Sequence, residues 1–373
     1  MYKPKNTKLS TESYGILNAI RNEIGGQFRD ATPIVKEAED AKAYGYVVMG
    51  SGDFKNIFAT ALINRIASVV CFVRSYQNSL AKYKRGKLDY GEVVENVWVN
   101  LVAPAGYTQS VEHPGDVFKT NNPETKASFH PVNSKLVYTI TVNDNELSMA
   151  FTSADGMYNL VERIVGRLND SDEWDTYILT KYMIARAFLD NAGIATETQA
   201  LTSANANEIV KDMKAVSNDM RFMNTAYNIQ KVATHTPIED QIFMLTAKSS
   251  ATIDVGSLAR AFNLSYVDFI GQSEMINTFE FTEAEEARLD EIMTETANQG
   301  LIPGYTKLTE DDKGKLEKIV GAIVDRDFYM IFDRLYEMTS QYDPLHLNTN
   351  SFLHHWAVYS YNPFANVRFF VEP

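Results

Sequence analysis

The chain has 373 residues, of which 45% are hydrophobic and 12% aromatic, and its formal net charge is −13. This length is sufficient for one large or two ordinary hydrophobic cores. The acidic balance argues against a general nucleic-acid-binding protein, because contacts to phosphate need clustered Lys and Arg side chains. The acidic balance is compatible with a protein that encloses DNA without binding to it.

Cysteine content and hydropathy exclude further classes of protein. Cys71 is the single cysteine, so there is no intrachain disulfide and no Cys-based zinc site. It lies in an apolar run, which is typical of a small buried side chain. No apolar stretch reaches the ~20 residues that a membrane-spanning helix needs. The basic segment 1–8 lacks the apolar stretch of a signal peptide, so we expect folding in the cytosol.

The first ninety residues have the pattern of an arm. Residues 9–29 carry a helical apolar spacing, with Ser10 or Thr11 as the expected N-cap. We expect a strand over residues 44–52 and a helix over residues 54–73. The short basic patch at residues 82–87 is interpreted as a solvated turn in preference to a phosphate or partner contact.

Residues 91–151 contain two segments with period-two alternation, at residues 97–101 and 136–142. Between them lie about thirty residues rich in Pro, Gly, Asn and His, and a structureless loop of this length is uncommon in a compact domain. We therefore expect a long two-stranded ribbon. Such a ribbon is marginal in water by itself, so it needs another surface, and a neighbouring subunit is the economical source.

The remaining residues indicate a mixture of helices and strands. Apolar spacing from Met157 to Leu189 predicts one long helix, with a possible kink at residues 169–173. A loop is expected at 194–208, helices at 209–220 and 255–262, and strands at 241–246 and 328–332. Capping boxes at Thr282 and Thr309 predict an acidic helical hairpin over residues 282–325, and residues 352–371 should return as strands.

A search for chemistry finds no catalytic residue, no metal site and no cofactor site. The six histidines have none of the spacings that bind metals, and neighbouring His354 and His355 point to opposite faces of a strand. The carboxylates Glu283, Glu285 and Glu286 are interpreted as a solvated helix face. We therefore expect a protein that is not an enzyme.

The order of these parts resembles the Hong Kong 97-type capsid fold of tailed phages. Short segments also resemble, in the same order, the major capsid proteins of phi twenty-nine-type podophages. They are Thr11-Glu-Ser-Tyr14, Asn18-Ala-Ile-Arg-Asn22, Ala259-Arg-Ala-Phe-Asn263, Asp268-Phe-Ile-Gly271, Arg326-Asp-Phe-Tyr-Met330 and Phe364-Ala-Asn366. Each match is short, and their common order over nearly the whole chain makes the set specific.

The resemblance implies an α+β fold with defined parts. Residues 1–90 would be the N-terminal arm, and 91–151 the extended loop that lies across the adjacent subunit. Residues 152–203 and 344–373 would form the peripheral domain with its spine helix. Residues 204–343 would form the axial domain, with the acidic hairpin at 282–325 as an insertion. The family resembled also has a C-terminal immunoglobulin-like domain, for which we expect no counterpart here.

The resemblance also implies a function and partners. Many copies of the chain would assemble as pentamers and hexamers into the icosahedral head, in the cytoplasm of a host bacterium. The head would enclose double-stranded DNA without sequence-specific binding, with a scaffolding protein as a guide, a portal protein at one vertex and no membrane. The expected interface residues, in the loop tip and the arm, are Tyr107, His113, Pro114, Val117, Phe118, Tyr14, Ile20 and Phe28.

Two alternatives stay open on the sequence. One is an enzyme with a site in residues 204–343, which would need a pocket with converging titratable groups. The other is an encapsulin-like nanocompartment, which shares the capsid fold and would carry a cargo-binding pocket. The phage-type segments favour the viral shell protein over both.

Overall fold

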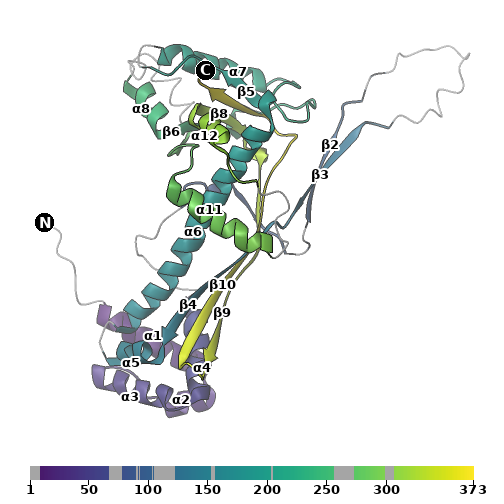
Figure 1. Cartoon of the computed structure of the whole chain (residues 1–373). Coiled ribbons are helices and arrows are strands. Elements are labelled where there is room, and N and C mark those ends of the chain that lie inside the picture. Colours follow the sequence, from purple (N-terminus) through teal and green to yellow (C-terminus); the bar gives the residue numbers. More distant parts are fainter. Residues whose placement is uncertain are drawn as a thin grey trace, which may run out of the picture. The chain divides into compact units, whose positions relative to one another are not determined.

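The computed structural model describes residues 9–66, 78–89, 91, 93–102, 104, 122–152, 156–202, 205–255, 273–298 and 306–373. The chain forms two compact units. Unit 1 comprises residues 1–81, 134–177 and 335–356, and unit 2 comprises residues 82–133, 178–334 and 357–373. Helices and strands are both abundant, so the expected α+β class is confirmed (Figure 1).

The helices that lie wholly in unit 1, among the described residues, are α1 (Leu9–Ile24), α2 (Gly26–Ala31), α3 (Ala38–Met49), α4 (Gly52–Ile66) and α5 (Asp144–Thr152). The helix predicted over residues 9–29 is present, but it begins ahead of the expected caps and is divided at Gly25. The backbone of Gly25 has φ 65°, a left-handed conformation that favours glycine. The helix predicted from residue 54 is confirmed as α4, and residues 67–73, with Cys71, lie outside the described residues.

The strand predicted at residues 44–52 is wrong, because those residues belong largely to α3. A capping box between Glu37 and Asp40 starts this helix. Tyr44 is completely buried in the core of unit 1, where its ring contacts those of Phe28, Phe58 and Phe151 at centroid distances of 6.0–6.1 Å. Packing of this face of the helix outweighs the strand propensity of the local sequence.

A four-stranded sheet has the order β1-β9-β10-β4. Its strands are β1 (Lys84–Lys87), β9 (Tyr329–Asp343), β10 (Asn348–Tyr361) and β4 (Ser134–Asn143). The predicted strands at 136–142 and 328–332 are confirmed, and β9 continues well beyond the expected end. The basic patch at 82–87 is not a solvated turn: Lys84 Nζ lies 3.1 Å from Asp333 Oδ1, and Arg85 pairs with Asp327.

The central sheet of unit 2 has five strands in the order β5-β11-β8-β6-β7. They are β5 (Ala195–Glu197), β11 (Val367–Val371), β8 (Ile319–Asp325), β6 (Gln241–Thr246) and β7 (Ser273–Ile276). Helix α7 (Ala206–Met220) buries Ile209, Met213 and Met220 against the sheet residues Phe243, Val320, Ile323 and Phe370. The predicted helix at 209–220 and strands at 241–246 and 352–371 are thus confirmed.

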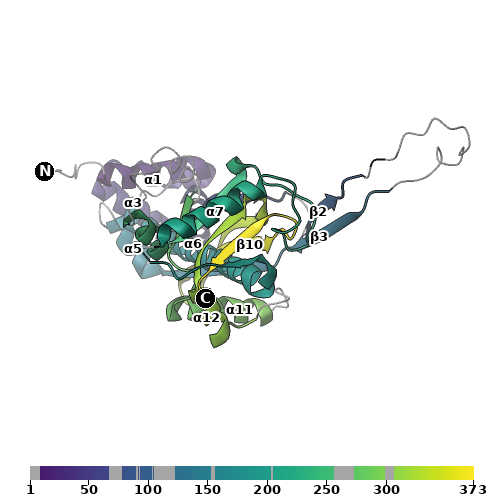
Figure 2. The same cartoon turned by 90° about the horizontal axis from the view of Figure 1, so that it is seen from above.

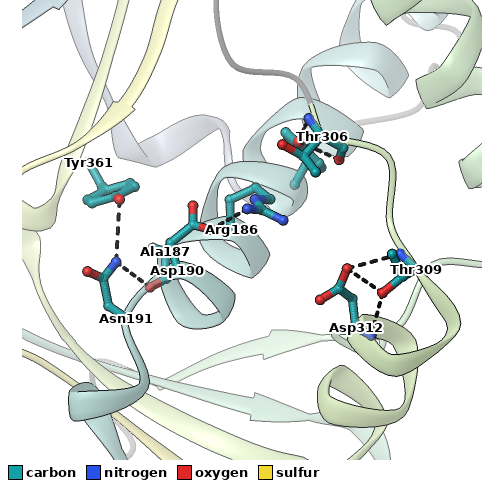
Figure 3. Close-up of polar contacts among 9 residues, drawn as sticks. Arg186, Ala187, Asp190, Asn191, Thr306, Thr309, Asp312 and Tyr361 are labelled. Carbon is teal, nitrogen blue, oxygen red and sulfur yellow. Dashed lines mark hydrogen bonds and ion pairs between the residues drawn. The ribbon is translucent and has the colours of Figure 1, made fainter.

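The predicted long helix is confirmed as α6 (Gly156–Asp190), which runs without interruption through residues 169–173. Close to its end Arg186 pairs with Asp190, and Asn191 donates to the carbonyl of Ala187 at 2.9 Å (Figure 3). Asn191 also donates to the hydroxyl of Tyr361 at 3.4 Å. A 3-10 turn (Ala192–Ile194) and strand β5 (Ala195–Glu197) follow, and α7 begins at Ala206, so the loop predicted at 194–208 is wrong at both of its ends.

The predicted acidic hairpin is correct only in its helices, α11 (Glu283–Asn298) and α12 (Glu310–Glu317). Thr309 and Asp312 form the expected capping box at α12 (Figure 3). Residues 319–325 are instead the fully buried strand β8, so the predicted helical hairpin is wrong over these residues. Glu285 is 4% exposed, which contradicts its interpretation as part of a solvated face.

Helix α8 (Ala247–Val255) precedes the helix predicted at residues 255–262, and residues 256–262 lie outside the described residues. In the described part of the chain, further 3-10 turns occupy residues Ala81–Tyr83, Ile238–Asp240 and Arg326–Phe328.

Candidate functional site

A separate two-stranded ribbon in unit 2 consists of β2 (Val93–Val99) and β3 (Thr125–Pro131). The predicted two-stranded excursion is therefore present, although its second strand is β3 and not the segment at 136–142, which pairs in the four-stranded sheet. Both views show β2 and β3 side by side (Figures 1 and 2), and in Figure 1 they point away from β5, β6 and β8 of the same unit.

The two strands of the ribbon are antiparallel and have a continuous register, from the pair Val93 and Pro131 to the pair Val99 and Thr125. Successive side chains of a strand point to opposite faces. This register therefore defines an outer face and an inner face. The outer face consists of Val93, Glu95, Val97, Val99, Thr125, Ala127, Phe129 and Pro131, and the inner face of Val94, Asn96, Trp98, Lys126, Ser128 and His130.

Every residue of the outer face is exposed, and all except Glu95 and Thr125 are apolar. The exposed fraction is 54% for Val97 and 64% for Phe129, and Leu101 and Val102 continue the apolar character beyond β2. Contiguous exposed apolar surface of this kind marks a site of contact with another molecule. The outer face is therefore the candidate binding surface of this chain.

The inner face rests on other residues of unit 2 through polar contacts. Trp98 Nε1 donates to the carbonyl of Ala233 at 3.2 Å. The ring nitrogens of His130 lie 2.7 Å from the hydroxyl of Ser360 and 3.0 Å from that of Ser128. Burial lowers the pKa of His130, so its ring is neutral at neutral pH. The two faces of the ribbon thus have opposite character.

The arm residues expected at an interface lie in the core of unit 1. Ile20 and Phe28 are 0% and 2% exposed, and Tyr14 packs against the same cluster of apolar side chains. Burial removes Ile20 and Phe28 from the surface that a neighbour can contact, whereas Tyr14 is only partly buried. The expected loop-tip residues Tyr107, His113, Pro114, Val117 and Phe118 lie outside the described residues.

The sequence indicated only part of the outer face. The alternation of Val97 and Val99 with Trp98 placed the two valines on one side of a strand. Phe129 was missed, although β3 is as long as β2, because β3 lies between segments rich in Asn, Pro and His. The alternation of Ala127, Phe129 and Pro131 with polar residues is the signal that would have identified it.

A polar pocket of about 280 Å³ lies elsewhere in unit 2. Thr246 and Ser249 contribute hydroxyl groups 2.6 Å apart, and Lys248, Glu317 and Lys318 contribute charges. None of the described residues that line it is a histidine or a cysteine. Within the described part of the chain, no three His, Cys, Asp or Glu side chains gather as metal ligands, and no helix has the length and hydropathy to cross a membrane.

A comparison with solved structures defines the class of fold. A chain in the capsid structure of Staphylococcus phage Andhra superposes with a TM-score of 0.62, covering 82% of this chain and 87% of that one at 11% identity. At this identity the likeness concerns the fold alone. The architecture is that of a tailed-phage capsid subunit, and the expected Hong Kong 97-type fold is confirmed.

Comparisons of sequence define the family. The model of the family described as "Phi29-like phage major capsid protein" matches residues 17–371, so the chain belongs to this family. The major capsid protein of Bacillus phage GA-1 is 29% identical over 97% of this chain and 70% of its own length. That of Bacillus phage PZA is 27% identical over 97% of this chain and 73% of its own length. The chain is accordingly a structural component of the virion, and its copies assemble into the head.

Proposed function

We propose that the outer face of the ribbon binds a neighbouring copy of the subunit in the shell. The observation that carries this proposal is the exposed apolar surface on a strand pair whose opposite face rests on its own subunit. Tyr107, His113, Pro114, Val117 and Phe118 would extend the contact at the loop tip. Apolar surface that is exposed on the free subunit is buried when the neighbour binds, so association is favoured by the hydrophobic effect.

The contact would be modest for each subunit and large for the shell. Full burial of a side chain such as Val97 or Phe129 contributes about 1.5–3 kcal/mol. Because each subunit binds several neighbours in a closed assembly, such contributions add to a stable particle while single contacts stay weak enough to be broken and corrected.

The roles that we propose for the segments of the subunit follow from the family resemblance. We propose that the part of residues 91–151 ahead of β4 extends across the adjacent subunit, since β4 and α5 contribute Val142 and Phe151 to the core of unit 1. Residues 152–203 and 344–373 would form the peripheral domain. Residues 204–343 would pack around the five- and six-fold positions, in pentamers and hexamers. The presence of β6, β7 and β8 in one sheet supports a common domain for the last segment, and the same sheet joins it to β5 and β11 of the segments assigned to the peripheral domain.

The remaining partners are proposed on the same basis. A scaffolding protein would guide assembly in the cytoplasm of the host bacterium, and a portal protein would occupy one vertex. The net charge of −13 supports a shell that encloses double-stranded DNA without binding its phosphates. We propose a structural role without catalysis, which the match to a family of phage major capsid proteins supports.

The experiment is a test of assembly with charged substitutions on the outer face. The double variant Val97→Asp/Phe129→Asp should raise the subunit concentration needed for shell formation more than about tenfold, since each lost contact is worth over about 1.4 kcal/mol. Electron microscopy and sedimentation measure shells and free subunits. The matched control is Val137→Asp, an equally exposed valine on β4 (51%) that should still assemble. Normal assembly of the double variant would contradict the proposal.

A further inference from the structure

We infer that Trp98 and His130 are positioning residues, which hold the ribbon in one fixed direction relative to the five-stranded sheet of unit 2 before any neighbour binds. This inference rests on the proposed function of the ribbon. It concerns the free subunit, so it is tested without assembly.

The first anchor of the ribbon lies at its base, where β3 meets β10. His130 is 4% exposed, and its Nδ1 lies 2.7 Å from the hydroxyl of Ser360. Asn133 Nδ2 donates to the carbonyl of Tyr359 at 2.8 Å, and the amide of Tyr359 donates to Asn133 Oδ1, also at 2.8 Å. A side chain that satisfies both backbone groups of one residue restrains rotation as well as distance. The end of β3 is therefore fixed on β10.

The second anchor lies further along the ribbon, at Trp98. His130 is paired in register with Val94, and Trp98 is four residues beyond Val94 on the same strand. At 3.3–3.4 Å per residue, the two anchors are separated by about 13 Å along the ribbon. Trp98 Nε1 donates its single N–H group to the carbonyl of Ala233. With one anchor the ribbon could rotate about that point, whereas two anchors at this separation fix the direction of the ribbon.

The segment that receives Trp98 is itself firmly held. Asn224 and Thr234 exchange backbone hydrogen bonds of 2.9 and 3.1 Å, which close this segment on itself. Asn228 binds the backbone of Val232 twice, at 2.7 Å, through its side-chain oxygen and nitrogen. Asn366, which is 0% exposed, donates to Thr236 Oγ1 at 3.0 Å and joins the segment to the start of β11. The carbonyl of Ala233, which accepts the hydrogen bond from Trp98, therefore lies in a segment that several hydrogen bonds hold in place.

Fixing the ribbon in advance has a physical consequence for association. A binding element that is already ordered loses less conformational entropy when it binds, so more of its contact energy appears as affinity. A closed shell also requires that every subunit present its contact in a compatible direction, because a heterologous contact with the wrong rotation does not close. Trp98 and His130 would therefore act on both the strength and the accuracy of assembly.

The experiment measures the direction of the ribbon in the unassembled full-length chain. After replacement of the single cysteine by Cys71→Ser, spin labels are attached at Thr125→Cys on the ribbon and Lys211→Cys on α7, both exposed positions of unit 2. Pulsed electron spin resonance then gives the distribution of distances between the labels. We expect one narrow distribution in this parent and a broadened, shifted one in Trp98→Phe/His130→Leu. Trp356→Phe, in unit 1, is the matched control and should leave the distribution narrow.

Each outcome decides for or against the inference. A distribution that stays narrow and unshifted in the double variant overturns it. If the double variant does not fold, Trp98→Phe alone removes the indole N–H donor and keeps an aromatic ring, and an unshifted distribution there overturns the inference too. Failure of this inference is distinct from failure of the proposed function, which is read from shell formation by Val97→Asp/Phe129→Asp.

Discussion

Lys181 of α6 and Glu285 of α11 form an ion pair inside unit 2, with Lys181 Nζ 3.1 Å from Glu285 Oε2. Their side chains are 0% and 6% exposed. Glu285 also accepts a hydrogen bond of 2.8 Å from the amide of Thr282, at the start of α11. Burial lowers the pKa of Lys181, and the adjacent carboxylate opposes this effect. The pair therefore joins α11 to the long helix at a site where an unpaired charge is costly.

Substitution of one partner of this pair should destabilise the subunit strongly. Lys181→Met leaves the Glu285 carboxylate buried without its counter-charge, so we expect the free energy of unfolding to fall by about 3–5 kcal/mol. Urea unfolding of the unassembled subunit measures it. The double variant Lys181→Met/Glu285→Gln removes the charge and keeps the acceptor for Thr282, and should recover most of the loss. Equal stability of the single and double variants would show that the pair is not the cause.

Gly321 on β8 is predicted to tolerate no side chain. A Cβ atom at this position would lie 2.7 Å from the carbonyl oxygen of Met244 on the neighbouring β6. Gly321→Ala should therefore lower the free energy of unfolding by about 1–3 kcal/mol through overpacking. Gly314→Ala is the matched control, because that Cβ meets nothing within 4 Å in α12. The control should raise the free energy of unfolding by about 0.5–1 kcal/mol. Thermal or urea unfolding of both variants distinguishes the two effects.

Asp325 should make the stability of the subunit depend on pH. Burial raises the pKa of its carboxyl to about 6, against the opposing effect of its hydrogen bond with Thr236. Between about pH 4 and pH 6 the folded state holds a proton that the unfolded state has released, so the free energy of unfolding falls as pH rises through this window. The total loss is up to about 3 kcal/mol.

Asp325→Asn tests this dependence, because the side chain of Asn does not titrate. In the native protein the backbone N–H of Asp327 donates to Asp325 Oδ1 at 2.8 Å, and the side-chain oxygen of Asn can still accept this hydrogen bond. Urea unfolding at about pH 4 and about pH 7 should show the variant gaining stability relative to the native protein at the higher pH. If the two proteins instead differ in free energy of unfolding by the same amount at both pH values, the prediction is wrong and Asp325 has an ordinary pKa.

Long periodic elements were predictable because their patterns are local. The apolar spacing from Met157 to Leu189 repeats over many turns, and it located α6 to within one or two residues at each end. The alternation in β10 likewise distinguishes one buried face, with Leu353 and His355, from the other face, with Phe352 and His354. A pattern of this length predicts the element correctly even where single residues are compatible with either a helix or a strand.

Elements stabilised by distant partners were not predictable in the same way. The carboxylate of Glu285 looked solvated because its partner, Lys181, lies 104 residues earlier in the chain. Strand β8 was assigned to a helical hairpin, although its buried face is decided by pairing with β6 and β11. The outer face of the ribbon was half predicted, since alternation identifies a face but not which of the two faces rests on Ala233 and Ser360.

Shortening the loop of the ribbon should separate folding from assembly. A deletion that extended to residue 130 would remove β3 and the anchor His130. The change should therefore stop before Glu124, because the carbonyl of Glu124 accepts a hydrogen bond from the amide of Asn100 at 2.8 Å. Replacement of residues 103–121 by a short Gly-Ser linker keeps this closing bond and the register of β2 and β3.

We expect the shortened subunit to fold with an unchanged thermal midpoint and to form no closed shells, because the proposed function assigns the removed residues to the contact with a neighbouring subunit. Calorimetry measures the midpoint, and electron microscopy scores the particles. An inert linker exchange of the same kind in the exposed turn at residues 344–346, between β9 and β10, reports on general effects of loop replacement. A shortened subunit that no longer folds would place the loop in its own core, and one that assembles normally would remove the loop tip from the proposed contact.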